Sequence, residues 1–162
     1  MVQTHEPLVQ EHPFFHDLPE AHLKFMTGSA KRVEFPEQHY ISREGEEAKE
    51  FYAICDGLVS LELLIPGLGP TTVQTVREGE ILGWSWITPP YRWRFDAKTL
   101  QKTRAFLLDA DALRAKCQED HDLGYEMLKR FTDIIVARLD ATRLQLLDLY
   151  NTGPLSTQHR RK

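Results

Sequence analysis

The sequence predicts a mainly β fold, a sandwich or barrel-like roll of short strands with helices before and after it in the chain. Between about residues 32 and 108, apolar and polar residues alternate in short runs, as where Ser60 and Glu62 separate Val59, Leu61 and Leu63. Gly and Pro residues separate these runs, which is typical of all-β domains. Outside that region apolar residues recur every three or four positions, which indicates helices.

The first predicted element is a short helix near the N-terminus. Asp17 can cap it, Pro19 stands in its first turn, and Leu23 and Met26 supply an apolar face. We expect residues 1–11 ahead of it to form a disordered lead. The strand signals and turn residues then alternate in this order: Val33 and Phe35, Gly45, Asp56-Gly57, Val59 to Leu63, Pro66-Gly67, Gly69-Pro70, Val73 and Thr75, Gly79, Pro89-Pro90, and Phe106-Leu107-Leu108.

Two helices are predicted after the strands. Asp109 can cap a short one through Leu113 and Cys117, and Asp120 can cap a long one that runs to about Tyr150. One small β domain cannot cover the whole length of this helix. We therefore expect a homodimer through its apolar stripe; the alternative is that the helix folds back across its own β domain. The predicted interface residues are Leu128, Phe131, Ile135, Leu139, Leu146 and Leu149. Residues 151–162 are expected to form a disordered tail.

The composition indicates one ordinary globular domain. The chain has 162 residues, 24 acidic and 20 basic side chains, a net charge of −4 and 41% apolar residues. This balance and a basic end of only three residues, 160–162, predict no nucleic-acid partner. No run approaches about 18 apolar residues and the start lacks a signal-peptide pattern, so no membrane contact is expected. Cys55 and Cys117 are isolated, which indicates thiols in a reducing cytoplasm.

Several stretches carry a family resemblance. Residues 12–19, His-Pro-Phe-Phe-His-Asp-Leu-Pro, resemble the opening helix of cyclic nucleotide-binding domains of the catabolite-activator type. Residues 35–61 resemble the strands that follow, and the turn glycines Gly45, Gly57, Gly79 and Gly83 fall where that family has its own. The resemblance covers residues 12–150. It implies a double-stranded β-helix, a jelly-roll-like β-roll of eight strands, with short N-terminal helices and a long C-terminal helix at about 120–150 that dimerises.

The resemblance also implies where a ligand would bind. In this family a short loop and helix follow the glycine that matches Gly83, and backbone N–H groups there hold a phosphate. A Glu binds the ribose hydroxyl and an Arg pairs with the phosphate. Here Trp84 stands at the position of the Glu and Trp93 at that of the Arg, while a one-residue slip puts Arg92 or Arg94 there. The candidate ligand-binding residues are Gly83, Trp84, Ser85, Trp86, Arg92, Trp93 and Arg94.

These replacements argue against cyclic AMP as the ligand. Losing an acceptor for the ribose hydroxyl forfeits about 1.5–3 kcal/mol, and an indole has one donor and no acceptor. All three tryptophans fall between residues 84 and 93. One interpretation is an aromatic pocket for a flat, apolar or anionic ligand with Arg92 or Arg94 as counter-ion. The other is that the aromatic side chains fill the pocket as a plug.

No pattern in the sequence predicts catalysis, a metal or a cofactor. A metal-dependent enzyme on such a roll needs His ligands on its strands, and residues 40–108 contain no His. Nucleophile and phosphate-loop motifs are absent from the sequence as well. We therefore expect a non-catalytic, ligand-sensing or regulatory domain that has no DNA-binding domain after residue 150 and acts through a protein partner. The alternatives are a ligand-free dimeric scaffold and residual binding of cyclic AMP or cyclic GMP.

Overall fold

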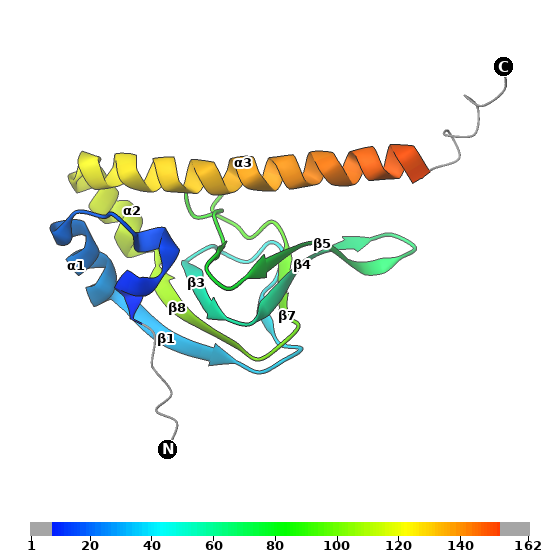
Figure 1. Cartoon of the computed structure of the whole chain (residues 1–162), viewed down its shortest axis with the longest axis horizontal. Coiled ribbons are helices and arrows are strands. Elements are labelled where there is room, and N and C mark those ends of the chain that lie inside the picture. Colours follow the sequence, from blue (N-terminus) through cyan, green and yellow to red (C-terminus); the bar gives the residue numbers. More distant parts are fainter. Residues whose placement is uncertain (1–7, 153–162) are drawn as a thin grey trace. The chain divides into compact units, whose positions relative to one another are not determined.

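A computed structural model describes residues 8–152, and its central part is a β-roll (Figure 1). Within the described residues, eight antiparallel strands form two four-stranded sheets, which confirms the predicted mainly β fold. The strands are β1 (Ala30–Phe35), β2 (Tyr40–Ser42), β3 (Glu50–Asp56), β4 (Leu58–Ile65), β5 (Gly69–Arg77), β6 (Ile81–Leu82), β7 (Asp96–Thr99) and β8 (Thr103–Asp109).

The sheets join strands that are far apart in the sequence. One sheet has the order β1-β8-β3-β6 and the other β2-β7-β4-β5. Val59 and Leu61 of β4 are buried, as the alternation predicted, and Leu61 lies opposite Ala97 of β7. The intervening Ser60 and Glu62 are buried as well, so the burial of β4 does not follow the alternation. Phe51 of β3 is fully buried as well. The core of the roll therefore contains Val59 and Leu61, which the alternating pattern selected, and residues such as Phe51, which it did not.

The four turn glycines have the backbone geometry that only glycine adopts easily. Their φ angles are +88° at Gly45, +119° at Gly57, +83° at Gly79 and +97° at Gly83. At Gly57 a side chain would also collide with the backbone and side chain of Thr103. The glycine pattern on which the family resemblance rested thus has a conformational cause.

The N-terminal segment differs from the prediction in two ways. Residues 1–11 were expected to be disordered, but Val9–Glu11 form a 3-10 helix (η1) and Val9 is buried; residues 1–7 lie outside the described part. Asp17 was expected to cap the first α-helix. It instead has φ +60°, and α1 (Glu20–Ser29) begins after Pro19 without a side-chain cap.

A buried histidine holds this N-terminal segment on the roll. His12 precedes a second 3-10 helix, η2 (Pro13–Phe15). Its Nδ1 accepts a hydrogen bond from the Phe14 N–H at 3.2 Å, so its Nε2 carries the proton and donates to the Ile54 carbonyl at 3.0 Å. Both ring nitrogens are thus used by the neutral form. Burial lowers the pKa of His12, although its backbone hydrogen bonds oppose this effect.

Both predicted aspartate caps are present in the C-terminal helices. Asp109 accepts a hydrogen bond from the Ala112 N–H at 2.9 Å and begins α2 (Ala110–Glu119). Asp120 accepts from the Leu123 N–H at 3.2 Å and begins α3 (His121–Thr152). The second oxygen of Asp120 lies 3.2 Å from Nε2 of His22, which connects α1 to the junction of α2 and α3.

The chain divides into two compact units, residues 1–125 and residues 126–162. The described part of the second unit is the remainder of α3, up to residue 152. Five of the six residues predicted for a dimer interface have exposed fractions between 36% and 68%: Leu128, Ile135, Leu139, Leu146 and Leu149. Phe131, the sixth, is buried. The predicted tail at 153–162 lies outside the described residues. None of the helices described has the length and apolarity needed to cross a membrane.

Candidate functional site

The segment that the sequence singled out, Gly83–Arg94, is called the cassette here and connects β6 to β7. All its residues are described, and they form turns instead of the helix that the resemblance implied. The Ile87 N–H donates to the Trp84 carbonyl at 3.3 Å, and the Tyr91 N–H to the Thr88 carbonyl at 3.1 Å. The two prolines at 89 and 90 explain the difference, because proline has no N–H donor and disfavours helical geometry in the preceding residue.

Trp93 packs directly on Gly83. A Cβ atom added to Gly83 would lie 2.6 Å from Cη2 and 3.1 Å from Cζ3 of the Trp93 ring. The ring is buried, with 8% of the residue exposed. Trp93, which one alignment of the resemblance matches to the phosphate-binding Arg, thus fills the space beside Gly83. This contact requires glycine at position 83 independently of its φ angle.

Backbone hydrogen bonds hold Trp93 in this place. The segment before β3 pairs with the end of the cassette: the Trp93 N–H donates to the Glu46 carbonyl at 2.8 Å, and the Gly45 N–H donates to the Trp93 carbonyl at 2.8 Å. The Ala48 N–H donates to the Tyr91 carbonyl at 2.7 Å. The indole is therefore positioned by main-chain pairing on both sides.

The other two tryptophans have different environments. Trp86 has 4% of its surface exposed and stacks on Phe51 of β3, with ring centroids 5.3 Å apart and an interplanar angle of 13°. Ser85, beside it, is also buried. Trp84 is half-buried, and the guanidinium carbon of Arg94 lies 5.5 Å from the centroid of its ring. Trp84 is thus the tryptophan of the three that retains an accessible surface.

Both candidate counter-ions are exposed side chains. Arg92 donates from Nη1 to the Gly45 carbonyl at 2.8 Å, and its backbone forms a β-bridge with Glu47. Arg94 covers the ring of Trp84. Asp96, which follows the cassette, pairs with Arg43 at 3.4 Å. Of the two guanidiniums, the one on Arg94 therefore lies against an aromatic face of the cassette.

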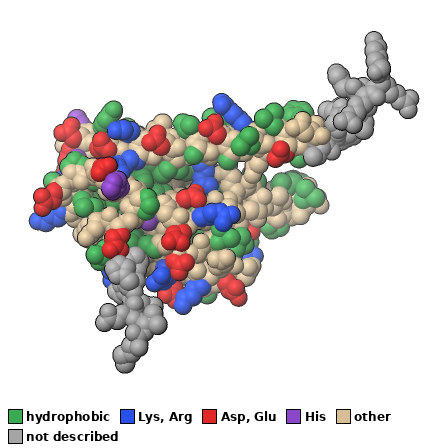
Figure 2. All heavy atoms as spheres, viewed as in Figure 1, with side chains coloured by type: hydrophobic (Ala, Val, Ile, Leu, Met, Phe, Trp, Pro, Cys, Tyr) green, Lys and Arg blue, Asp and Glu red, His purple; other side chains and the backbone are tan. Residues whose placement is uncertain are grey.

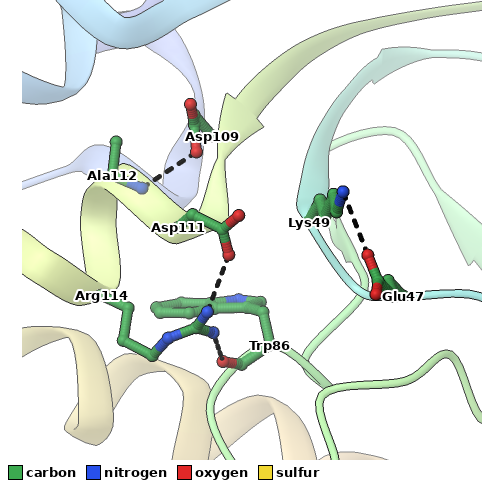
Figure 3. Close-up of polar contacts among 7 residues, drawn as sticks. All are labelled: Glu47, Lys49, Trp86, Asp109, Asp111, Ala112 and Arg114. Carbon is green, nitrogen blue, oxygen red and sulfur yellow. Dashed lines mark hydrogen bonds and ion pairs between the residues drawn. The ribbon is translucent and has the colours of Figure 1, made fainter.

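Arg114 of α2 contacts the cassette at two points, and Figure 3 shows the one at Trp86. Its Nη1 donates to the Trp86 carbonyl at 2.7 Å, and its guanidinium carbon lies 4.1 Å from the centroid of the Tyr91 ring. Its Nη2 also pairs with Asp111 at 2.7 Å. Sequence reasoning missed Arg114, because it lies 20 residues beyond the cassette. The i,i+3 spacing from Asp111 was the signal present, and such pairs are common on helices.

A second contact connects the start of β3 to the start of α2. The Ala110 N–H donates to the Lys49 carbonyl at 2.9 Å. The Lys49 side chain lies 3.0 Å from Glu47, an exposed ion pair that lowers the pKa of Glu47 and raises the pKa of Lys49 (Figure 3). Together with Arg114, these contacts tie α2 to the cassette and to the chain that pairs with it.

The described side chains provide aromatic faces, guanidiniums and backbone donors. They include no group of three or more His, Cys, Asp or Glu residues able to hold a metal ion. At the cassette, the accessible groups are the indole of Trp84 and the guanidinium of Arg94, which suit stacking and charge pairing.

Comparison with known families shows the family to which the chain belongs. The model of the cyclic nucleotide-binding domain matches residues 32–120, which include the cassette and seven strands in full. The chain belongs to the family of cyclic nucleotide-binding domains. This cyclic nucleotide-binding domain is 26% identical over 127 residues to the CRP-like cAMP-activated global transcriptional regulator of Mycobacterium tuberculosis. That match covers 78% of this chain and 55% of the relative, so the chain spans about half the length of the curated relatives it matches.

Solved structures resemble this domain over most of its length. A putative cyclic nucleotide-binding protein from Geobacter metallireducens GS-15 superposes with a TM-score of 0.72 at 25% identity, covering 78% of this chain and 91% of that one. The catabolite activator protein of Thermus thermophilus gives a TM-score of 0.65 at 19% identity, covering 85% and 62%. The family is regulatory, and the resemblance stated from the sequence is confirmed.

Proposed function

We propose that this chain is a non-catalytic regulatory domain whose cassette responds to a small aromatic or anionic effector and not to cyclic AMP through the usual Glu and Arg contacts. One observation carries the proposal: the buried ring of Trp93 lies on Gly83, at the position that the resemblance gives to the phosphate-binding Arg. A cyclic phosphate in that place would have to displace an indole that main-chain pairing holds.

Two further features support the exclusion of cyclic AMP. Trp84 stands where the ribose-binding carboxylate would be and has no acceptor atom to offer. The cassette contains turns and no helix, so it lacks the N-terminal dipole that favours a phosphate in this family. The cassette thus departs from the family at all three elements that bind the cyclic nucleotide, namely the Glu, the Arg and the N-terminus of the short helix.

The accessible part of the cassette defines the effector class. Trp84 offers an aromatic face and Arg94 a guanidinium beside it, 5.5 Å from ring centroid to guanidinium carbon. A flat anion can stack on the indole while its charge pairs with the guanidinium, replacing the cation–π contact with a charge-assisted hydrogen bond.

Arg114 connects the cassette, where such an effector would bind, to the C-terminal helices. Because Arg114 binds the Trp86 carbonyl (Figure 3) and the Tyr91 ring, a shift of the cassette changes the contacts of α2. An effector that binds one arrangement of these contacts better than the other shifts the population of α2 positions. α3 follows α2 directly at Asp120 and would carry the signal to a partner.

The sequence of α3 fits a homodimer. Exposed positions alternate at spacings of three and four residues along one side of the helix, as in a coiled coil. They are Tyr125, Leu128, Thr132, Ile135, Leu139, Thr142, Leu146 and Leu149, called the seam here. The hydroxyls of Thr132 and Thr142 donate to carbonyls of their own helix at 2.6 and 2.9 Å. Both threonines therefore fit an apolar contact between two copies. Two free thiols agree with a reducing, cytoplasmic location.

Fluorescence and calorimetric titrations with 1-naphthoate, cyclic AMP and cyclic GMP test the proposal. Naphthoate is expected to bind and to lose most of its affinity in Arg94→Met, while Arg77→Met, an exposed arginine on β5, serves as the control. Micromolar binding of cyclic AMP that Arg92→Ala or Arg94→Ala removes would overturn the proposal in favour of residual cyclic-nucleotide binding.

A ligand-free scaffold is the second candidate function. The burial of Trp86 and Trp93 favours it, because both side chains already occupy space in the core. This function predicts a dimer that binds none of the three probes but still binds a protein partner through α3. Naphthoate binding that depends on Arg94 rules it out.

A further inference from the structure

The helix α3 carries a second line of side chains beside the seam. Each seam residue from Thr132 to Leu149 is followed directly by a member of this line, and one residue corresponds to a rotation of about 100° around a helix. The members recur at spacings of three and four residues. They are Asp133, Val136, Asp140, Arg143, Leu147 and Tyr150, called the second stripe here.

The apolar side chains of the second stripe are exposed. The exposed fractions are 50% at Val136, 57% at Leu147 and 67% at Tyr150. Figure 2 shows hydrophobic side chains at the surface along this helix, interspersed with charged ones. A two-stranded coiled coil through the seam covers the a and d positions of the heptad, whereas the second stripe occupies the b and e positions next to them. Dimerisation through the seam therefore leaves most of the second stripe accessible.

The two central charges of the second stripe have opposite sign. Arg143 lies 3.7 Å from Asp140 of the same helix, and 67% and 62% of these side chains are exposed. Solvent screens such a pair, so it contributes little to the helix itself. A parallel copy in register would place each of these charges beside its own like. An antiparallel copy places each Asp140 beside an Arg143, so charge complementarity selects the antiparallel direction.

The other members of the second stripe match in the same arrangement. When two copies of the helix lie antiparallel with their midpoint between residues 141 and 142, Asp140 of one copy is level with Arg143 of the other. Val136 and Leu147 are also equally far from this midpoint. So are Asp133 and Tyr150, and a tyrosine hydroxyl can donate to a carboxylate. The second stripe is thus complementary to itself, as an interface on a two-fold axis requires.

From this self-complementarity we propose that the second stripe binds the same stripe of another copy in the antiparallel direction and so joins two seam dimers, a step that rests on the homodimer proposed above. Two carboxylates and two guanidiniums form the centre of the contact, and a pair of Val136 and Leu147 lies on each side. Because the contact is small, we expect a dissociation constant on the order of 100 µM.

Sedimentation equilibrium of the full chain from about 10 µM to about 1 mM tests the proposal, because this range spans the expected dissociation constant. The average mass should rise from that of a dimer towards that of a tetramer. Leu147→Asp, in the second stripe, should hold the mass at that of a dimer. Leu144→Asp places the same charge on an exposed leucine outside both the seam and the second stripe, and should behave as the wild type.

A charge exchange tests the direction of the contact. Asp140→Arg gives the second stripe two arginines and Arg143→Asp gives it two aspartates, so each variant repels its own copy and should remain a dimer. An equimolar mixture of the two variants restores opposite charges between helices, and its mass should again exceed that of a dimer. Both variants lack the ion pair within the helix, so helix stability cannot explain such a recovery.

Several outcomes distinguish the two interfaces. A wild-type mass that stays at the dimer and that Leu139→Asp alone reduces would overturn the second stripe and leave the seam intact. A dimer that Leu147→Asp and the charge variants dissociate, and Leu139→Asp does not, would support the second stripe and overturn the seam. A chain that stays monomeric would overturn both. Wild-type association of Asp140→Arg alone, or no recovery in the mixture, would overturn the antiparallel contact.

Discussion

Gly83 is constrained twice, by its φ of +97° and by the Trp93 ring that covers it. Gly45 has the first constraint without the second: its φ is +88°, and nothing lies within 4 Å of an added Cβ. Gly45→Ala should therefore cost the backbone term alone, about 1–2 kcal/mol. Gly83→Ala should cost that term plus the collision with Trp93, roughly 3 kcal/mol or more in total. Urea denaturation of both variants measures the difference.

The double variant Gly83→Ala, Trp93→Ala locates the source of the extra cost. Removing the indole leaves only the φ term, so the penalty of Gly83→Ala in this background should approach that of Gly45→Ala. An unchanged penalty would mean that Trp93 does not occupy the space at Gly83. The proposed exclusion of a cyclic phosphate would then lose its physical basis.

His12 makes the stability of the N-terminal segment depend on pH. Burial holds its pKa below 6.5, so the folded state binds fewer protons than the unfolded state between the two pKa values. The contribution of neutral His12 to the free energy of unfolding should be complete above pH 6.5 and should decrease as the pH falls below it. Urea denaturation at pH 8 and pH 5.5 measures this change. His12→Gln should be less stable at pH 8 and less sensitive to pH, with the exposed His39→Gln as control; an unchanged pH dependence in His12→Gln would contradict this assignment.

At the scale of elements, the side chain of Arg114 attaches α2 to the cassette through several contacts. Arg114→Met removes the ion pair with Asp111 and the hydrogen bond to the Trp86 carbonyl, which is left without this donor. We expect a loss of about 1–3 kcal/mol, and faster amide hydrogen exchange in α2. Denaturation and exchange measurements on the same sample test both effects.

A matched arginine is available on α3. Arg143 forms the same i,i+3 pair with Asp140 at 3.7 Å and is largely exposed. Arg143→Met should cost no more than about 0.5 kcal/mol, because screened pairs of this type contribute little. Equal losses in Arg114→Met and Arg143→Met would show that the contacts with the cassette add nothing to the ion pair.

At the scale of the whole molecule, the seam of α3 predicts self-association. Leu139→Asp puts a charge in the middle of the seam and should weaken the dimer by roughly thirtyfold or more, about 2 kcal/mol. Leu144→Asp changes another exposed leucine, which lies outside the seam, and should leave the dimer intact. Sedimentation velocity over a range of protein concentrations separates the two variants. A wild-type chain that stays monomeric at high concentration would contradict the proposed homodimer.

The sequence predicted the fold well because its determinants are local. Alternation marked β4, glycines with positive φ marked the turns, and Asp109 and Asp120 marked two helix starts, and each of these signals acts within a few residues. The N-terminal cap was predicted wrongly. Asp17 matches the sequence pattern of a capping residue, but its backbone has a left-handed conformation, with φ +60°, and its side chain does not cap α1.

The site was less predictable because its determinants are contacts between distant residues. The position of the cassette followed from Gly83, but the ring that covers Gly83 belongs to a residue ten positions later. Whether the tryptophans line or fill a pocket depended on Phe51, and the attachment of α2 depended on Arg114. Periodicity carries no information on such pairs, and a motif search finds only spacings that are known in advance.

The clustering of the three tryptophans has a practical consequence. Because all of them lie between positions 84 and 93, the tryptophan emission of the whole protein originates from the cassette. The protein thus carries an intrinsic optical probe of this one segment. Quenching by iodide should divide the signal into an accessible component from Trp84 and a protected component from Trp86 and Trp93. An effector at the cassette would change the accessible component first.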